Sequence, residues 1–96
     1  MRLEIIANHS VEEDILEALR QRGVGKYFTK IPSVQGIGSS DPRLGDHIWP
    51  EENFLLILYC DARQTDRVVE AVKEVKARFK DEGIKLFAVP ESKELV

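Results

Sequence analysis

Apolar and polar side chains alternate near the start of the chain, as is typical of a half-buried strand. From residue 3 to residue 8 the alternation places on one face Leu3, Ile5 and Ala7. The next apolar residues follow helical spacing and predict an amphipathic helix with a buried stripe of Val11, Ile15, Ala18 and Leu19. Ser10, with Glu13 three residues later, has the pattern of a capping box at the start of this helix. Gly23 is suited to end the helix in a left-handed conformation.

A second strand is predicted from Lys26 to Gln35, a segment rich in aromatic and β-branched residues. Pro32 lies inside this segment and has no N–H to donate to a neighbouring strand. The strand should therefore lie at a sheet edge or carry a bulge. After an apolar-poor loop, residues 54–60 form a continuous apolar run of strand length.

A second helix and a last strand complete the pattern. We expect the helix to open at Asp61 with Gln64, or slightly later at Thr65, and to close at Gly83. Its apolar stripe is spaced by four, three and four residues and consists of Val68, Val72, Val75 and Phe79. Residues 84–89 then predict the last strand, which a proline stops.

The order β-α-β-loop-β-α-β is the split βαβ, or ferredoxin-like, pattern. We therefore predict an α+β sandwich in which a four-stranded antiparallel sheet carries both helices on one face. The chain is expected to form a single domain over residues 1–96, with a long loop at residues 36–50. Most hairpin connections need roughly two to five residues, and longer loops are usually functional or disordered. We therefore expect this loop to take part in recognition.

The run at residues 54–60 is apolar on both of its faces. Successive side chains of a strand point in opposite directions, so Phe54, Leu56 and Leu58 cannot share a face with Leu55, Ile57 and Tyr59. The helices can cover only one face, and soluble monomers rarely expose a large apolar patch. We therefore expect a closed homo-oligomer to cover the second face. The alternative is that strand twist and the long loop bury this face within one chain.

The composition restricts the class of partner and the compartment. The 14 basic and 17 acidic residues give a net charge of −3, which argues against nucleic acid as the main partner. Cys60 is the single cysteine and allows no disulfide within the chain, as suits a reducing compartment. The first apolar run is too short for a signal peptide, and no run approaches the roughly 20 residues that span a bilayer. We expect a cytoplasmic protein that is not itself a membrane protein.

Several segments give the chain a resemblance to a known family. These are Gly36-Ile-Gly38 at the end of the second strand, the acid-capped segment 61–75, and the closing segment 83–90. Together with the long loop they resemble the PII signal-transduction superfamily, and residues 45–57 look like a PII-like subgroup. The resemblance covers nearly the whole chain in layout, with few diagnostic identities.

The resemblance implies a ferredoxin-like homotrimer with ligand clefts between subunits. It also implies a loop, here residues 36–50, that docks on an enzyme or a transporter, and a regulatory protein without enzymatic activity. PII proteins hold ATP or ADP partly through a glycine- and lysine-rich loop before the last strand, where this chain has only the short turn 80–83. After Gly-x-Gly a typical PII protein continues with Arg-Gln, whereas this chain continues with Ser39-Ser40. Nucleotide therefore remains a candidate effector without the usual ATP loop.

The candidate site residues fall almost entirely in the loop. A small effector is expected at the loop base, on backbone amides and hydroxyls of Gly36, Gly38, Ser39 and Ser40. The residues expected to meet a partner protein are Asp41, Arg43, Asp46, His47 and Trp49. A metal ion could be held by imidazole and carboxylates of His47, Asp46 and Glu51, with His9 joining from another strand end.

Simpler explanations of the same residues stay open. The glycines at the loop base can merely let the chain leave the sheet, and Trp49 can fasten its own loop to the core. One histidine among exposed carboxylates also describes many surface loops. A metal-binding CutA-like or efflux-associated trimer, with His47 and its neighbours as ligands, is the main functional alternative. An ACT-like module that binds an amino acid between subunits is a further one.

Overall fold

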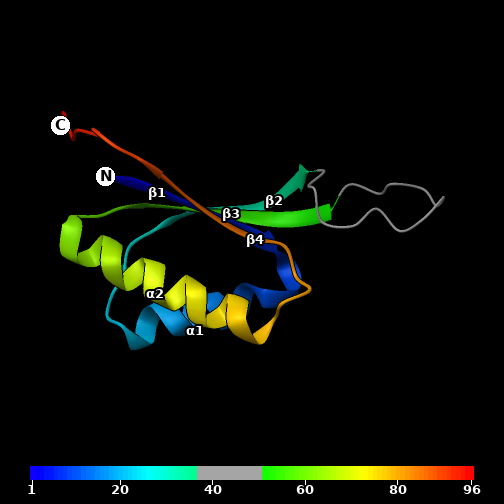
Figure 1. The fold of residues 1–96 in the computed structure, drawn as a ribbon. Helices are drawn as coiled ribbons and strands as arrows, with labels where there is room; N and C mark the ends of the chain where they lie inside the picture. Colours follow the sequence, from blue (N-terminus) through cyan, green and yellow to red (C-terminus); the bar gives the residue numbers. More distant parts are fainter. Residues whose placement is uncertain (37–50) are drawn as a thin grey trace.

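The computed structural model describes residues 1–36 and 51–96, and these form one antiparallel sheet with two α-helices against it (Figure 1). The four strands lie in the order β2-β3-β1-β4. The elements are β1 (Arg2–Asn8), a 3₁₀ turn η1 (His9–Val11), α1 (Glu12–Gln21), β2 (Thr29–Gly36), β3 (Glu51–Tyr59), α2 (Ala62–Arg78) and β4 (Ile84–Val89). The predicted ferredoxin-like α+β fold is confirmed. Within the described ranges, no helix is long and apolar enough to cross a membrane.

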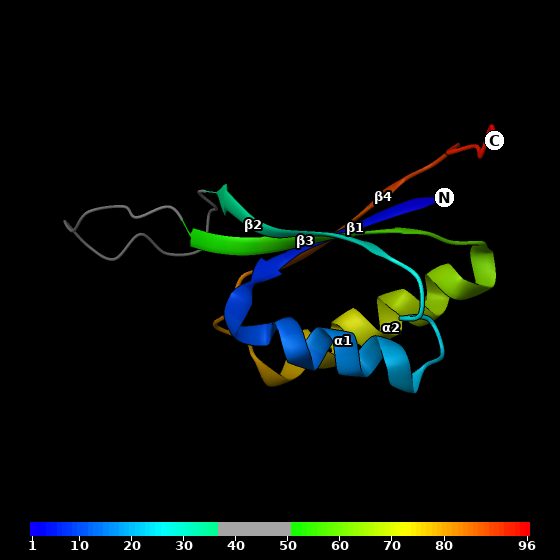
Figure 2. The same ribbon diagram turned by 180° about the vertical axis from the view of Figure 1, so that it is seen from behind.

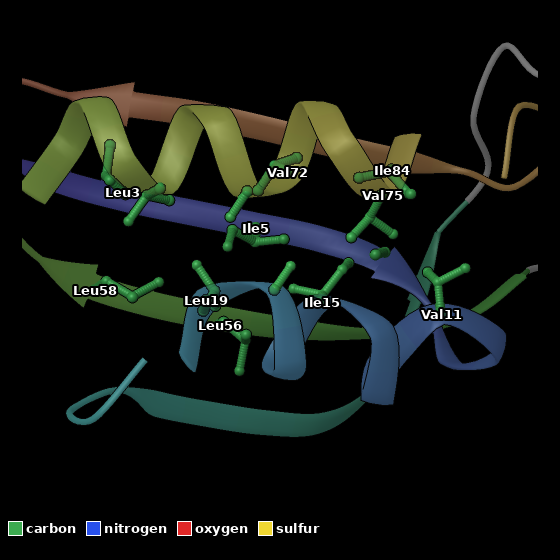
Figure 3. Close-up of a cluster of buried hydrophobic side chains, with 14 of the residues drawn as sticks. Leu3, Ile5, Val11, Ile15, Leu19, Leu56, Leu58, Val72, Val75 and Ile84 are labelled. Atoms are coloured by element: carbon green, nitrogen blue, oxygen red, sulfur yellow. The ribbon is translucent and has the colours of Figure 1, made fainter. Parts of the chain in front are cut away.

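Both helices lie on the same face of the sheet, and no helix of the described residues lies on the opposite face (Figures 1 and 2). The core fills the space between the two layers, as Figure 3 shows. β1 contributes the predicted face, and both helices contribute their predicted stripes, except that Phe79 lies one residue beyond α2 and is only partly buried. The largest fully buried side chains are Phe54, Leu3, Ile5, Ile15, Leu19, Leu56, Leu58, Ile84, Val11, Val68 and Val75.

The start of α1 differs from the prediction. The Asn8 side chain, rather than Ser10, acts as a cap, because its Oδ1 accepts a hydrogen bond from the Ser10 N–H at 2.9 Å. This interaction closes η1 first, and α1 begins only at Glu12 without a side-chain cap. The predicted capping box between Ser10 and Glu13 is therefore wrong. The end of this helix is as predicted, since Gly23 adopts φ 70°.

β2 is both an edge strand and a bulged strand, the two alternatives that Pro32 predicted. It forms one edge of the sheet, and its register against β3 shifts between Ile31 and Val34. A residue without an N–H therefore lies where the ladder is already interrupted. The strand begins at Thr29, three residues later than predicted.

α2 opens with the predicted capping box. The Gln64 N–H donates to Asp61 Oδ1 at 2.8 Å, and Gln64 Oε1 accepts from the Asp61 N–H at 3.0 Å. The helix ends at Arg78 rather than at Gly83, and Phe79 is its C-cap. The Gly83 carbonyl instead accepts a hydrogen bond from the Asn8 N–H at 3.0 Å, so Gly83 belongs to the entry of β4. The short turn expected at residues 80–83 is present, with the Glu82 N–H donating to the Phe79 carbonyl.

Candidate functional site

The face of the sheet without helices is largely apolar. Phe54, Leu56 and Leu58 point into the core, which leaves Leu55, Ile57 and Tyr59 on the other face. The strand registers place more apolar residues beside them. Ile31 of β2 lies opposite Leu55 of β3. Glu4 of β1 lies between Ile57 of β3 and Phe87 of β4. The exposed large side chains of this open face are Ile31, Tyr59, Phe87 and Val89. The prediction that one apolar set lacks a covering helix is confirmed.

Within residues 1–36 and 51–96, one ion pair interrupts this open face. Arg2 Nη2 lies 2.6 Å from Glu4 Oε2, and both residues belong to β1, between the apolar side chains of β3 and β4. The buried Arg2 Nε has no hydrogen-bond partner among the described residues. A buried donor without a partner costs about 1–3 kcal/mol, so this group can favour an acceptor from outside the described part of the chain.

Aromatic side chains surround a hollow of about 390 Å³ at the start of β2. Tyr27 and Phe28 precede the strand, and Tyr59 closes the hollow from β3, which lies beside β2 in the sheet. The Lys26 ammonium lies 5.4 Å from the centre of the Tyr27 ring, a cation–π arrangement. Exposed rings beside a cation suit a planar ligand that carries negative charge.

Tyr59 also borders a larger hollow of about 820 Å³ near the end of β4. Its walls come from the ends of three strands and from the segment that follows β4; they include Arg2, Tyr59, Cys60, Asp61, Val89 and Ser92. Burial raises the pKa of the Cys60 thiol; the N-terminal ammonium opposes this rise, and the neighbouring Asp61 carboxylate adds to it. A thiol with a raised pKa is a poor nucleophile, so the hollow is suited to binding rather than covalent chemistry.

The base of the predicted loop is described on its β2 and β3 sides. Gly36 ends β2 opposite Glu51, and a Cβ at Gly36 would lie 3.7 Å from Asn53 Nδ2, which is an ordinary contact. Among the described residues, nothing at Gly36 demands a glycine. Asn53 Oδ1 is buried there without a described hydrogen-bond partner. The loop base therefore offers one unused acceptor.

A polar cluster links β2 to the start of α1. Glu12 Oε2 lies 2.9 Å from Lys30 Nζ, and Glu12 Oε1 lies 3.1 Å from His9 Nδ1. The hydrogen bond from Lys30 holds the pKa of Glu12 below its usual value against the opposing effect of burial, and the hydrogen bond with His9 and the charges of both partners lower this pKa further. The His9 ring lies 6.1 Å from the Phe54 ring. These contacts fasten the edge strand to the helix layer.

The remaining predicted site residues lie outside the described residues. For the effector these are Gly38, Ser39 and Ser40; for the partner and the metal they are Asp41, Arg43, Asp46, His47 and Trp49. Of the proposed metal ligands, only the backbone of Glu51 is described, and His9 is engaged with Glu12. Over residues 1–36 and 51–96, no group of three or more potential metal ligands comes together.

The aromatic hollow was not anticipated from the sequence. The sequence pattern places Tyr27 and Phe28 inside the second strand, whereas this strand begins only at Thr29 and leaves both rings exposed. Their neighbour Tyr59 is more than thirty positions away in sequence and is placed beside them by the β2–β3 register. The signal that could have found the site was the run of two aromatic residues after Lys26.

Sequence comparison and structure comparison give different results. No family model matches the chain, and no curated protein matches its sequence. Solved structures do match. One is CPII, described as a nitrogen regulatory PII-like protein from Thiomonas intermedia K12 bound to ADP, AMP and bicarbonate; its TM-score is 0.67 at 20% identity, over 90% of this chain and 82% of that chain.

A second CPII structure, bound to ADP and bicarbonate, has a TM-score of 0.66 at 22% identity, over 90% of this chain and 79% of that chain. At this level of identity the likeness concerns the fold. The chain thus has the ferredoxin-like fold found in PII-like proteins.

Proposed function

We propose that this chain is a PII-like regulatory protein without enzymatic activity. It assembles as a homotrimer, binds a small effector in a cleft between subunits, and engages a partner enzyme or transporter through the loop at residues 36–50. The observation that carries the proposal is the apolar sheet face without helices, on the fold that CPII also has. Such a face needs a cover, and a second copy of the chain is the simplest one.

The effector that we propose is an adenine nucleotide, and bicarbonate is a second candidate. The CPII structures are described as bound to ADP, AMP and bicarbonate. In this chain, the hollow of Lys26, Tyr27 and Phe28 offers exposed rings for a base and a cation for a phosphate. Stacking of one base on an aromatic side chain contributes roughly 1–3 kcal/mol.

A cleft between subunits would combine two parts of the chain that a single copy keeps apart. β2 has 8 residues, so its ends lie roughly 23 Å apart at about 3.3 Å per residue. The aromatic hollow lies at one end of this strand and Gly36 lies at the other. One small ligand cannot touch both ends in one copy. Two neighbouring copies can each contribute one end, which supports placing the effector between Gly36–Ser40 of one subunit and the hollow of the next.

The mechanism is a population shift. The effector changes the loop only if it binds one loop conformation more tightly than the others. The loop base provides a direct route, because an effector held at Gly36 touches the residue from which the loop departs.

Thermal unfolding with and without ligand tests the proposal. ADP at 100 times its dissociation constant should stabilise the chain by about 2.7 kcal/mol. For a domain of this size that corresponds to a rise in Tm of roughly 10 to 20 °C. Tyr27→Ala should weaken ADP binding about tenfold, whereas Arg67→Ala on the exposed side of α2 should not change it. No shift with ADP, AMP or bicarbonate would refute the proposed effectors.

A further inference from the structure

A groove lies on the helix side of the molecule, between α2 and the edge strand β4. It has a volume of about 460 Å³ and is distinct from the hollows beside Tyr59. Its apolar lining includes Val69 and Val72 of α2 and Leu86 and Ala88 of β4. Ala88 is small and exposed although it shares the helix-side face with the buried Leu3, so the helix layer does not fill this position.

The charge around this groove has one sign. Lys73, Lys76 and Lys85 line it, and no carboxylate does so among the described residues. Lys76 is already engaged, because its Nζ donates to the Ile84 carbonyl at 3.2 Å. Lys73 is exposed and has no hydrogen bond or ion pair within the described part of the chain. An occupant of this groove should therefore be apolar and carry negative charge.

The segment after β4 has this chemistry. Residues 91–95 read Glu-Ser-Lys-Glu-Leu, so an exposed leucine directly follows a carboxylate. Leu95 is 84% exposed and touches little of its own chain. Glu91 has a left-handed backbone, with φ 66°, which interrupts the extended conformation just after Pro90. Figures 1 and 2 show the segment running away from the helix layer, toward the end of the sheet where the N-terminus lies.

We propose that residues 91–95 of one copy bind in the groove between α2 and β4 of a second copy. Leu95 enters the apolar lining beside Val69 and Ala88, and Glu94 pairs with Lys73. The segment does not reach its own groove in this structure, because its residues up to Glu94 line the hollow beside Arg2 and Tyr59 instead. This contact lies beyond the proposed regulatory function and adds an interface outside the open sheet face.

The contact has a consequence for symmetry. It joins two different surfaces, a segment and a groove, so each copy presents both. Contacts of this kind close into rings when the rotation between copies allows it. In a ring of three copies, the groove of each copy binds the segment of a neighbouring copy.

Disulfide trapping between two single-cysteine variants tests the contact. Cys60→Ser removes the native thiol, after which Ala88→Cys is placed in one chain and Leu95→Cys in another. Two cysteines can be joined only if their Cα atoms come within about 7 Å. After mixing and mild oxidation, we expect an 88–95 linkage between chains, identified by mass spectrometry. The matched control is Arg67→Cys mixed with Leu95→Cys, because Arg67 is also exposed but lies outside the groove.

The outcomes separate this proposal from its alternatives. An 88–95 yield no higher than the 67–95 yield overturns it. A chain carrying both Ala88→Cys and Leu95→Cys that closes only within itself also overturns it, since the segment then occupies its own groove. If linkage fails while the chain remains trimeric and ADP still raises Tm, the proposed regulatory function stands and only the segment contact is lost.

A charge exchange gives an independent readout. Lys73→Glu alone and Glu94→Lys alone should each weaken self-association about two- to fivefold, as expected for one lost exposed ion pair. The two substitutions together restore the opposite charges and should recover most of the loss. If the double variant instead lost as much self-association as the two single variants together, the pairing of Glu94 with Lys73 would be contradicted.

Discussion

Substituting Ile57 by aspartate should dissociate the proposed trimer without unfolding the chain. Ile57 lies near the middle of the open face, between Thr29 of β2 and Glu4 of β1. Its side chain points away from the core, so the helix-side packing of Phe54, Leu56 and Leu58 is not disturbed. Aspartate is preferred to lysine, because lysine could pair with Glu4 whereas aspartate adds a second negative charge beside it.

The magnitude follows from what the open face leaves exposed. Tyr59 is 65% exposed, Phe87 51%, Val89 42% and Ile31 41%. Full burial of one such side chain is worth about 1.5–3 kcal/mol, so covering the remaining half of all four contributes roughly 3–6 kcal/mol per copy. An unpaired carboxylate enclosed in this interface costs several kcal/mol. The dissociation constant should therefore rise at least about 100-fold.

Sedimentation equilibrium at micromolar concentration measures the result. We expect the Ile57→Asp chain to sediment as a single copy while its circular dichroism keeps the helical signal of the wild type. Arg67→Ala, which also makes the net charge one unit more negative but lies on the exposed side of α2, is the control and should leave the proposed assembly intact. An Ile57→Asp chain that sediments like the wild type would refute the proposal that another copy covers this face.

Three further changes test a buried side chain, a helix cap and an ion pair. Phe54→Ala empties a fully buried position and should lower the free energy of unfolding in urea by about 3–5 kcal/mol. Asp61→Ala removes the capping box of α2 and should cost about 0.5–2 kcal/mol, seen as a lower Tm; an unchanged Tm would mean that the cap does not contribute. Because the pKa of Glu12 is lowered on folding, its contribution is present above its unfolded pKa and lost as pH falls through the folded value. Lys30→Met should thus reduce stability at pH 7 but not at pH 2, and an equal loss at both would contradict the ion pair.

The elements were predictable from sequence because their signals are local. The alternation that buries Leu3 and Ile5, and the helical spacing that buries Val68, Val72 and Val75, depend only on which side faces the core. The wrong predictions concern the start of α1 and the end of α2, which depend on tertiary contacts. Asn8 replaced Ser10 as a cap because β1 delivers its side chain to the turn, and Gly83 was drawn into the sheet by the Asn8 N–H.

The candidate site was predictable only in part. The open face followed from sequence, because an apolar run without alternation must be apolar on two sides. The aromatic hollow could not be foreseen, since it depends on the register that sets Thr29 against Ile57 and brings Tyr59 beside Tyr27 and Phe28. The groove of Lys73 likewise arises only when α2 is packed beside β4. The roles predicted for His47 and Trp49 stay predictions.

Native mass spectrometry of the wild-type chain with ADP reports the proposed assembly and the proposed ligand in one spectrum. We expect a particle of three times the 11.0 kDa chain mass, carrying up to three ADP molecules. A particle of 11.0 kDa that carries no ADP would contradict both proposals.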